Sequence, residues 1–309
     1  YRVKFGTDPL LESLKQIAQE LKKYGVEEIN LVGGDPAEYS KIEELVKYLY
    51  NLGFQIPILS NTHSYKNSTI ERITPYVSSL EGTFHAPTAS EHNAFNQTVN
   101  SYEIMLDNLK TYDKLRNHNQ KLGAVLNVMN HNFEKLYEII YGLLEKGLNL
   151  NYVLIQRIGM YGRAKDDAQI LEIKNKLNKV FEQIARINEE LGIETSMVDA
   201  FPLCLISDEY HKYLSSCEWG INTASIDMTG NITRCAVADH SGSNLLGNIL
   251  DTPLQEIWTS SDTLISFRNK DYLNEECQKC INLPKCGGGC PISNGNNTLS
   301  SDILIRARK

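Results

Sequence analysis

Four cysteines in the segment 277–290 have the type and spacing of ligands for a metal ion or a metal cluster. Cys277, Cys280, Cys286 and Cys290 follow the pattern C-x2-C-x5-C-x3-C. The residues between them include Gly, Pro, Lys and Gln, which leave little apolar surface for a packed core. Thiolates held this close repel one another unless a bound metal offsets the repulsion. The spacing therefore predicts metal chemistry in this segment.

Cys217 and Cys235 form a second group upstream, with the spacing C-x12-G-x4-C, and Cys204 precedes it. Gly230 is expected in a hairpin turn between these two cysteines. The glycine run 287–289 is expected to adopt positive φ angles where a side chain would clash. A structural zinc ribbon is an alternative, but it uses four thiols and leaves the other three unexplained. Disulfides are disfavoured by the absence of a secretory signal at the start of the sequence.

Composition excludes several classes of protein. No apolar run approaches the roughly 20 residues that a membrane-spanning helix needs. The net charge of -7 argues against unspecific nucleic-acid binding, which depends on an excess of Lys and Arg. Seven cysteines without a secretory signal indicate a reducing compartment, so we expect a soluble, cytoplasmic protein with no nucleic-acid or membrane partner.

The first 165 residues alternate short apolar strands with amphipathic helices. This pattern predicts an α/β fold with a parallel sheet, either a barrel or an open doubly wound sheet. Asp8 is expected to cap the first helix, which Gly25 ends, and Ser40 with Glu43 to form a capping box for the second. Strands are expected at 28–32, 56–61, 80–85, 122–129, 152–158 and 193–198, and further helices at 69–77, 101–116, 133–146 and 166–191.

Polar residues follow the expected strands. They include the segment Gly33-Gly34-Asp35, the pair Ser60-Asn61, His85 and Arg157. In both parallel architectures, ligands bind at the carboxyl ends of the strands. We therefore expect Gly33, Gly34, Asp35 and Ser60 to line one cavity on one face of the sheet.

The complete cysteine pattern resembles the SPASM domain of radical S-adenosylmethionine enzymes, over residues 199 to 290. In that family the domain carries two auxiliary [4Fe–4S] clusters. The resemblance implies that Cys217, Cys235 and Cys290 bind the first cluster, and that Cys277, Cys280 and Cys286 bind the second. The family's final cysteine has no counterpart after Cys290. The second cluster then has an open position or a non-cysteine ligand, for which Asp302 is a weak candidate, or the final cysteine lies in a segment outside this sequence. Cys204 either completes the first cluster or is a small buried apolar residue.

The segment Leu31-Val32-Gly33-Gly34-Asp35-Pro36 resembles the Gly-Gly-Glu-Pro motif of radical S-adenosylmethionine barrels, with Asp in place of Glu. The resemblance implies that Gly33, Gly34 and Asp35 bind the amino group of S-adenosyl-L-methionine. It also places Ser60 and Asn61 near the ribose. Arg157, with the segment 162–164, would bind the methionine carboxylate, although a structural ion pair of Arg157 is an equal alternative.

In the family, a C-x3-C-x2-C loop after the first strand binds a third, catalytic [4Fe–4S] cluster. No cysteine precedes Cys204 here, so we expect that loop and the first barrel strand in an N-terminal segment outside this sequence. The resemblance then implies a partial (β/α)6 TIM-like barrel lacking its first strand over residues 1–165, a long helix and linking strand over 166–198, and a SPASM domain over 199–309.

The implied function is that of a radical enzyme, an oxidoreductase or lyase, that modifies a ribosomally synthesised peptide or protein. Hydrogen abstraction by a 5'-deoxyadenosyl radical would lead to a crosslink or to excision of residues. The implied partners are the precursor peptide, a separate leader-peptide-recognition protein and an external reductant. No catalytic residue can be named from the sequence. The alternative is a catalytically inactive peptide-binding protein stabilised by clusters or zinc.

Overall fold

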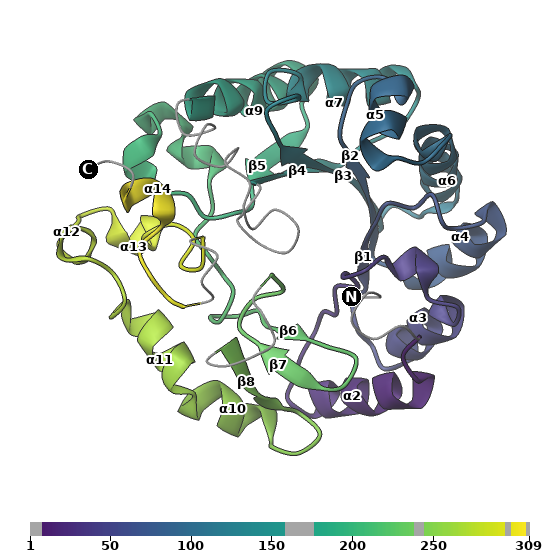
Figure 1. Cartoon of the computed structure of the whole chain (residues 1–309). Coiled ribbons are helices and arrows are strands. Elements are labelled where there is room, and N and C mark those ends of the chain that lie inside the picture. The colour runs from purple at the N-terminus through teal and green to yellow at the C-terminus, as the bar shows by residue number, and fades with distance from the viewer. Residues whose placement is uncertain (1–7, 158–175, 238–243, 294–297, 307–309) are drawn as a thin grey trace. The chain divides into compact units, whose positions relative to one another are not determined.

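The computed structural model describes residues 8–157, 176–237, 244–293 and 298–306 (Figure 1). The chain divides into two compact units, which interleave along the sequence. The first unit comprises residues 1–127, 134–154 and 186–195, and the second comprises 128–133, 155–185 and 196–309. The domains expected from the sequence, 1–165, 166–198 and 199–309, were consecutive segments of the chain, and their boundaries stay a prediction. None of the described helices has the length and apolar character required to cross a membrane.

A five-stranded sheet confirms the expected α/β class. Its strands lie in the order β1-β2-β3-β4-β5, which is also their order in the sequence. Strand β1 pairs in parallel with β2, and β2 pairs in parallel with β3. A doubly wound sheet reverses its strand order at a switch point, whereas a barrel continues in one direction. The sequential order therefore fits a partial TIM-like barrel. The strands are β1 Pro57–Ser60, β2 Ser79–Phe84, β3 Lys121–Val128, β4 Tyr152–Arg157 and β5 Glu194–Met197.

Helices alternate with the strands of the first unit, and α3, α4 and α6 lie on the outer side of β1 to β3 (Figure 1). Helix α3 buries an apolar stripe that includes Ile42, Val46 and Leu49. Helix α5 was not expected, because its eight residues show no periodic apolar stripe. The helices are α2 Leu11–Lys23, α3 Ile42–Asn51, α4 Asn67–Ile73, α5 Ala89–Asn96, α6 Ser101–Leu115 and α7 Leu136–Glu145.

The strand expected at 28–32 is not continuous. Only isolated parallel bridges join Glu28 to Gln55 and Leu31 to Ile58. Backbone hydrogen bonds still follow this edge, since the N–H groups of Ile29 and Leu31 donate to carbonyls beside β1. The segment thus runs alongside β1 without forming a regular strand.

Both helix caps expected near the N-terminus are wrong. Helix α2 begins at Leu11 without a side-chain cap, and the carboxylate of Asp8 accepts instead from the Ser40 N–H at 3.1 Å. Helix α3 also lacks a side-chain cap, because Glu43 binds the Arg72 guanidinium through both carboxylate oxygens. In each case a partner distant in the sequence competes successfully with the local cap.

Helix α9, Leu177–Leu191, ends at Gly192 as expected, and the start expected for it at 166 lies outside the described residues. The hairpin expected at Gly230 is confirmed, because β6 and β7 pair in antiparallel fashion around that residue, whose φ is +88°. Strand β8 extends this sheet and was not foreseen. The remaining elements are β6 Ser225–Ile226, β7 Asn231–Thr233, β8 Leu245–Asn248, α10 Leu254–Ser260, α11 Asp262–Asn269, α12 Glu275–Gln278, α13 Leu283–Cys286 and α14 Ile303–Arg306.

Candidate functional site

The loop that carries Gly33, Gly34 and Asp35 is fastened to the end of β1. The Asp35 carboxylate accepts hydrogen bonds from the Ala37 N–H at 3.0 Å, the Ser60 hydroxyl at 2.5 Å and the Asn61 N–H at 3.0 Å. The two glycines have φ angles of +82° and +58°, which favour glycine at both positions. The structure therefore brings Asp35, Ser60 and Asn61 together, as expected from their positions at strand ends.

These hydrogen bonds give the Asp35 carboxylate a structural role in the loop. Three donors from the chain itself already occupy its two oxygens, so the carboxylate holds the loop in place. Contact with the ammonium of S-adenosylmethionine stays a prediction, and the Gly33–Gly34 backbone is the better candidate for it. A shorter Asp in place of Glu suits this role, because a short side chain can accept from a backbone N–H two residues ahead.

Ser60→Ala is expected to lower the free energy of unfolding by about 1–3 kcal/mol, because buried polar groups lose their partner. The Ser60 hydroxyl donates to Asp35 and also accepts from the buried Thr62 N–H at 2.8 Å. Urea denaturation measures the loss. Thr259→Ala is the matched control, since its hydroxyl is bonded only locally on the exposed part of α10. Equal effects of the two variants would contradict the role given to Ser60.

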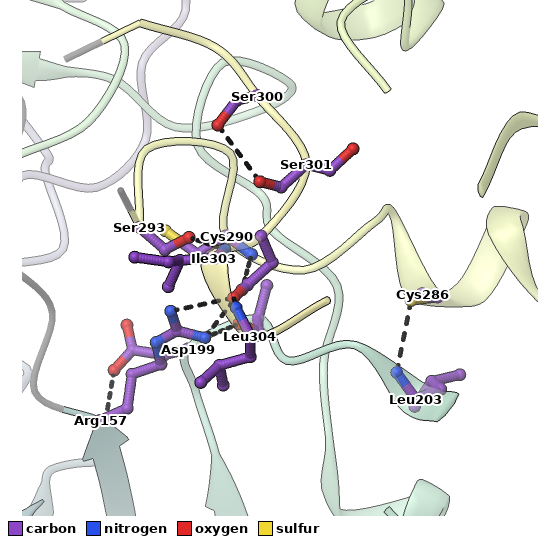
Figure 2. A network of polar contacts seen from close by, with 12 residues as sticks. Arg157, Asp199, Leu203, Cys286, Cys290, Ser293, Ser300, Ser301, Ile303 and Leu304 are labelled. Atoms are coloured by element: carbon purple, nitrogen blue, oxygen red, sulfur yellow. Dashed lines mark hydrogen bonds and ion pairs between the residues drawn. The ribbon is translucent and has the colours of Figure 1, made fainter. Parts of the chain in front are cut away.

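The Arg157 guanidinium is buried in an ion pair with Asp302. Its Nη1 lies 2.8 Å from Asp302 Oδ2 and 3.2 Å from the Ala200 carbonyl oxygen. The Phe201 ring lies 4.6 Å from the guanidinium carbon. The Arg157 backbone N–H donates to the Asp199 carboxylate at 2.7 Å (Figure 2). Burial raises the pKa of Asp199, and this hydrogen bond opposes the effect. The structural ion pair, left open by the sequence, is the arrangement present; the companion segment 162–164 lies outside the described residues.

Asp302 is the centre of this network. Besides Arg157, it accepts hydrogen bonds from the Cys290 N–H at 2.8 Å and from the Leu304 N–H at 3.0 Å (Figure 2). Its side chain is fully buried. A carboxylate held by these donors is committed to positioning the end of the cysteine motif. The role of Asp302 as a ligand of the second cluster stays a prediction, and these contacts do not support it.

Cys217, Cys235 and Cys290 form one group of thiols. Cys235 is buried beside Cys290, in a small apolar cluster with Ile292 and Trp219. Burial raises the pKa of Cys235 to about 12, and the charges of Cys290 and Cys217 act in the same direction, as neighbouring thiolates do. This grouping agrees with the ligand set that the resemblance implied for the first cluster.

A buried arginine provides positive charge beside this first group. Arg234 is 2% exposed, and its Nη1 lies 3.8 Å from Cys217 Sγ and 3.1 Å from the Trp219 carbonyl oxygen. The guanidinium also lies over the Phe267 ring. The charge of Arg234 lowers the pKa of Cys235 and so opposes the effect of burial on that thiol.

Cys277, Cys280 and Cys286 form a second group of thiols. Burial raises the pKa of Cys277 to about 11, with further contributions from the charges of Cys286, Cys204 and Cys280 in that order. The Leu203 N–H donates to Cys286 Sγ at 3.4 Å (Figure 2). Cys204 is exposed, so it is not a buried apolar residue. Leu203, its neighbour in the chain, contacts Cys286, and the role of Cys204 as a cluster ligand stays a prediction.

The glycine run 287–289 shapes the turn between Cys286 and Cys290. All three glycines have positive φ, as expected. A Cβ at Gly289 would lie 2.6 Å from Asp302 Oδ2 and 2.9 Å from Pro202 Cδ. The surrounding protein atoms therefore leave no room for a side chain at Gly289.

Among the described residues, no three His, Cys, Asp or Glu side chains surround a single-ion position. The thiolates of a [4Fe–4S] cluster each bind a different iron, so they are spread around the cluster and do not converge on one point. The donors are all sulfur, which suits iron–sulfur clusters and zinc better than hard cations. The two groups of thiols thus fit the chemistry of the two auxiliary clusters.

A histidine cluster lies after β2 in the first unit. The His85 ring is 5.4 Å from the His92 ring and 4.5 Å from the Phe95 ring, measured between centroids. His92, in α5, is fully buried, and its Nδ1 accepts from the His85 N–H. Burial lowers the pKa of His92 to about 4, and the charge of His63 adds to the effect.

Stability is expected to fall as the pH drops from 6.5 toward 4 because of His92. The unfolded chain binds a proton below its usual pKa of about 6.5, while the folded chain does so only near 4. The expected loss is about 2 kcal/mol between pH 6.5 and pH 5. Denaturant melts of His92→Gln should lack this component, whereas the exposed-site control His118→Gln should keep it. The same pH dependence in both variants would rule out the buried neutral imidazole.

Comparison with known proteins gives one family model and a set of distant relatives. Residues 217–281 match the model of the SPASM domain, described as an iron–sulfur cluster-binding domain. The PqqA peptide cyclase of Xanthomonas oryzae pv. oryzae is 20% identical over 287 residues, spanning 89% of this chain and 73% of the cyclase.

Two solved structures share the fold. SuiB of Streptococcus suis superposes with a TM-score of 0.70 at 15% identity, covering 95% of this chain and 70% of SuiB. The enzyme anSMEcpe, in a structure with bound AdoMet and the Cp18Cys peptide, also gives 0.70 at 15% identity, covering 97% and 86%. The chain is therefore similar to radical S-adenosylmethionine peptide maturases that carry a SPASM domain.

Proposed function

We propose that the protein is a radical S-adenosylmethionine enzyme that modifies a ribosomally synthesised precursor peptide or protein, assisted by two auxiliary [4Fe–4S] clusters. The observation that carries the proposal is the match of residues 217–281 to the SPASM model, a segment that holds Cys217 and Cys235 of the first group and Cys277 and Cys280 of the second. A single zinc ribbon would account for one such group only. The similarity to peptide-modifying relatives supports the enzymatic class.

The residues proposed to hold the cofactors come from two places. The thiols of the two groups would bind the auxiliary clusters, and the loop of Gly33 and Gly34, with Ser60 and Asn61, would bind S-adenosylmethionine. When reduced beside a catalytic cluster, S-adenosylmethionine supplies a 5'-deoxyadenosyl radical, and the protein orients the substrate hydrogen toward it. The proposal assigns that cluster to the family's C-x3-C-x2-C loop, whose cysteines are not among these residues.

The substrate is proposed to be a peptide, because solved relatives include SuiB bound to the precursor peptide SuiA and anSMEcpe bound to the Cp18Cys peptide. The outcome would be a crosslink or the excision of residues. An external reductant and a separate leader-peptide-recognition protein complete the proposed partners. The cytoplasm is the proposed compartment, because it keeps thiols reduced for cluster assembly.

A catalytically inactive, cluster- or zinc-stabilised peptide-binding protein is the second candidate. The observation in its favour is the ion pair between Arg157 and Asp302. This pair occupies the guanidinium that was predicted to bind the methionine carboxylate. Its discriminating property is the absence of S-adenosylmethionine cleavage in a protein that is fully loaded with clusters.

Cofactor cleavage by two forms of the protein tests the proposal. Residues 1–309 alone are expected to bind S-adenosylmethionine weakly, because isolated hydrogen bonds contribute only about 0.5–1.5 kcal/mol each. With dithionite they should release no 5'-deoxyadenosine, whereas a form extended through a C-x3-C-x2-C loop should release it. Calorimetry and product assay measure both. Cleavage by residues 1–309 would contradict the assignment, and a cluster-loaded but inactive extended form would favour the second candidate.

A further inference from the structure

We propose that the buried Arg234 is the fixed counter-charge of the first auxiliary cluster and makes that cluster easier to reduce. The inference rests on the proposed function, because it assumes that Cys217, Cys235 and Cys290 bind an iron–sulfur cluster. It gives a role to a side chain that is not itself a metal ligand. The residues involved all belong to the second of the two compact units.

The guanidinium of Arg234 contacts a proposed cluster ligand directly. Its Nη1 donates to Cys217 Sγ at 3.8 Å and to the Trp219 carbonyl oxygen at 3.1 Å. Hydrogen bonds to the sulfur atoms and the charge around a cluster are among the features that set its reduction potential. This contact therefore allows Arg234 to influence the reduction of the first cluster.

The charge of Arg234 is buried, since the residue is 2% exposed. A buried charge is strongly unfavourable unless an opposite charge lies beside it. The guanidinium carbon lies 4.5 Å from the centre of the Phe267 ring, and in the described part of the chain no carboxylate pairs with it. The contacted group able to carry the opposite charge is the Cys217 sulfur, as a thiolate bound to the cluster.

A second cation lies against the same aromatic ring. Lys270 Nζ is 4.2 Å from the centre of the Phe267 ring, on which the Arg234 guanidinium also packs. Two cations beside one ring repel each other, and an anion close to them offsets that repulsion. Positive charge is therefore concentrated where the first cluster would add negative charge.

The loop after Cys217 holds the arginine side chain in place. Gly220 has a φ of +86°, and a Cβ there would lie 2.6 Å from Arg234 Cγ and 3.0 Å from its Cδ. The glycine thus leaves room for the stem of the arginine. A cation fixed in advance needs no rearrangement when the electron arrives, so its full charge acts on the reduced state.

The direction of the effect follows from the charge of the two redox states. Reduction adds one electron, which an external reductant supplies, so the reduced cluster carries one more negative charge than the oxidised cluster. A nearby positive charge stabilises the more negative state more strongly. Arg234 is therefore expected to raise the reduction potential of the first cluster.

Redox titration of each cluster by itself tests the proposal. Cys277→Ser/Cys280→Ser disables the second group, and Cys217→Ser/Cys235→Ser disables the first. Each protein is made as the full chain of 309 residues and reconstituted anaerobically with iron and sulfide. Arg234→Gln and Arg234→Lys are then added to each background. Dithionite or photoreduced deazaflavin supplies the electrons, and electron paramagnetic resonance measures the reduced fraction.

Arg268→Gln is the matched control in the background with only the first group. This side chain carries the same charge in the same unit of the structure. Its guanidinium donates to the carbonyl oxygens of Gly220 and Trp258 and lies over the Trp258 ring. Its substitution therefore removes a positive charge without removing a hydrogen bond to a cluster ligand.

With only the first group present, Arg234→Gln is expected to reduce the equilibrium constant for one-electron reduction by roughly tenfold or more. A tenfold change corresponds to a potential lower by about 59 mV. Arg234→Lys keeps the charge but loses the planar donor fork, so its shift should be smaller. Arg268→Gln should also shift the potential less. With only the second group present, Arg234→Gln should have a smaller effect than on the first.

An unchanged potential in Arg234→Gln, equal shifts in Arg234→Gln and Arg234→Lys, or an equal shift in the second cluster overturns the proposal. If Arg234→Gln binds no cluster, iron content decides instead. Full loading of Arg234→Lys then supports the role of the charge, whereas loss of iron from both variants shows a purely structural arginine. Absence of iron from both parent backgrounds would overturn the proposed function, and this inference with it.

Discussion

Asp302→Ala is expected to lower the free energy of unfolding by about 3–5 kcal/mol. The substitution leaves the Arg157 guanidinium, whose side chain is 5% exposed, without its counter-ion. It also removes the acceptor of the Cys290 and Leu304 N–H groups. Asp302→Asn keeps one acceptor oxygen but loses the charge, so we expect a smaller loss than for Ala. Equilibrium unfolding in guanidinium chloride measures both.

An exposed ion pair provides the matched control. Arg186 and Glu190 lie at 2.9 Å in α9, and both side chains are about half exposed. Glu190→Gln should change stability by no more than about 0.5 kcal/mol, because exposed pairs contribute little. If Asp302→Ala and Glu190→Gln had similar effects, the Arg157–Asp302 pair would not be the structural anchor described above.

Gly289→Ala is expected to lower the free energy of unfolding by roughly 2–5 kcal/mol, the sum of backbone strain and steric overlap. The φ of Gly289 is +75°, and the new Cβ would lie 2.6 Å from Asp302 Oδ2 and 2.8 Å from Asp302 Cβ. Because Asp302 also holds the Cys290 N–H, iron bound by the first group should fall as well. Denaturant melts and iron analysis measure the two effects.

Gly147→Ala separates the two contributions. Its φ is +87°, yet a Cβ there would meet nothing within 4 Å. This variant should lose only the backbone contribution, about 1–2 kcal/mol. The difference between the two variants is then the steric cost at Gly289. A difference near zero would show that Pro202 and Asp302 do not restrict that position.

The strand-and-helix alternation was predictable because apolar periodicity is a local property. The residues of β1 to β5 carry it, and so do the long helices. Helix α5 was missed because its anchor is the buried His92, a polar residue that no hydrophobic pattern identifies. The expected caps failed for a related reason, since Asp8 and Glu43 bind partners distant in the sequence.

Only part of the candidate site was predictable from the sequence. The thiols were identified from their spacing along the sequence. The contact between the Leu203 N–H and Cys286 Sγ was not predictable, because these residues are 83 positions apart in the chain. The role of Asp302 depends on Arg157, which is 145 positions away in the chain. Such pairings follow from tertiary structure, and a single sequence contains no signal for them.

The measurement that tests the central claim most directly is the metal content of the anaerobically reconstituted chain. Two clusters predict about eight irons and eight sulfides per chain, with a broad visible absorption that Cys280→Ala diminishes. Zinc can occupy thiolate sites after aerobic purification, so oxygen must be excluded throughout. Iron and sulfide near these values would support the two-cluster account. Stoichiometric zinc without iron, under the same strictly anaerobic conditions, would contradict it.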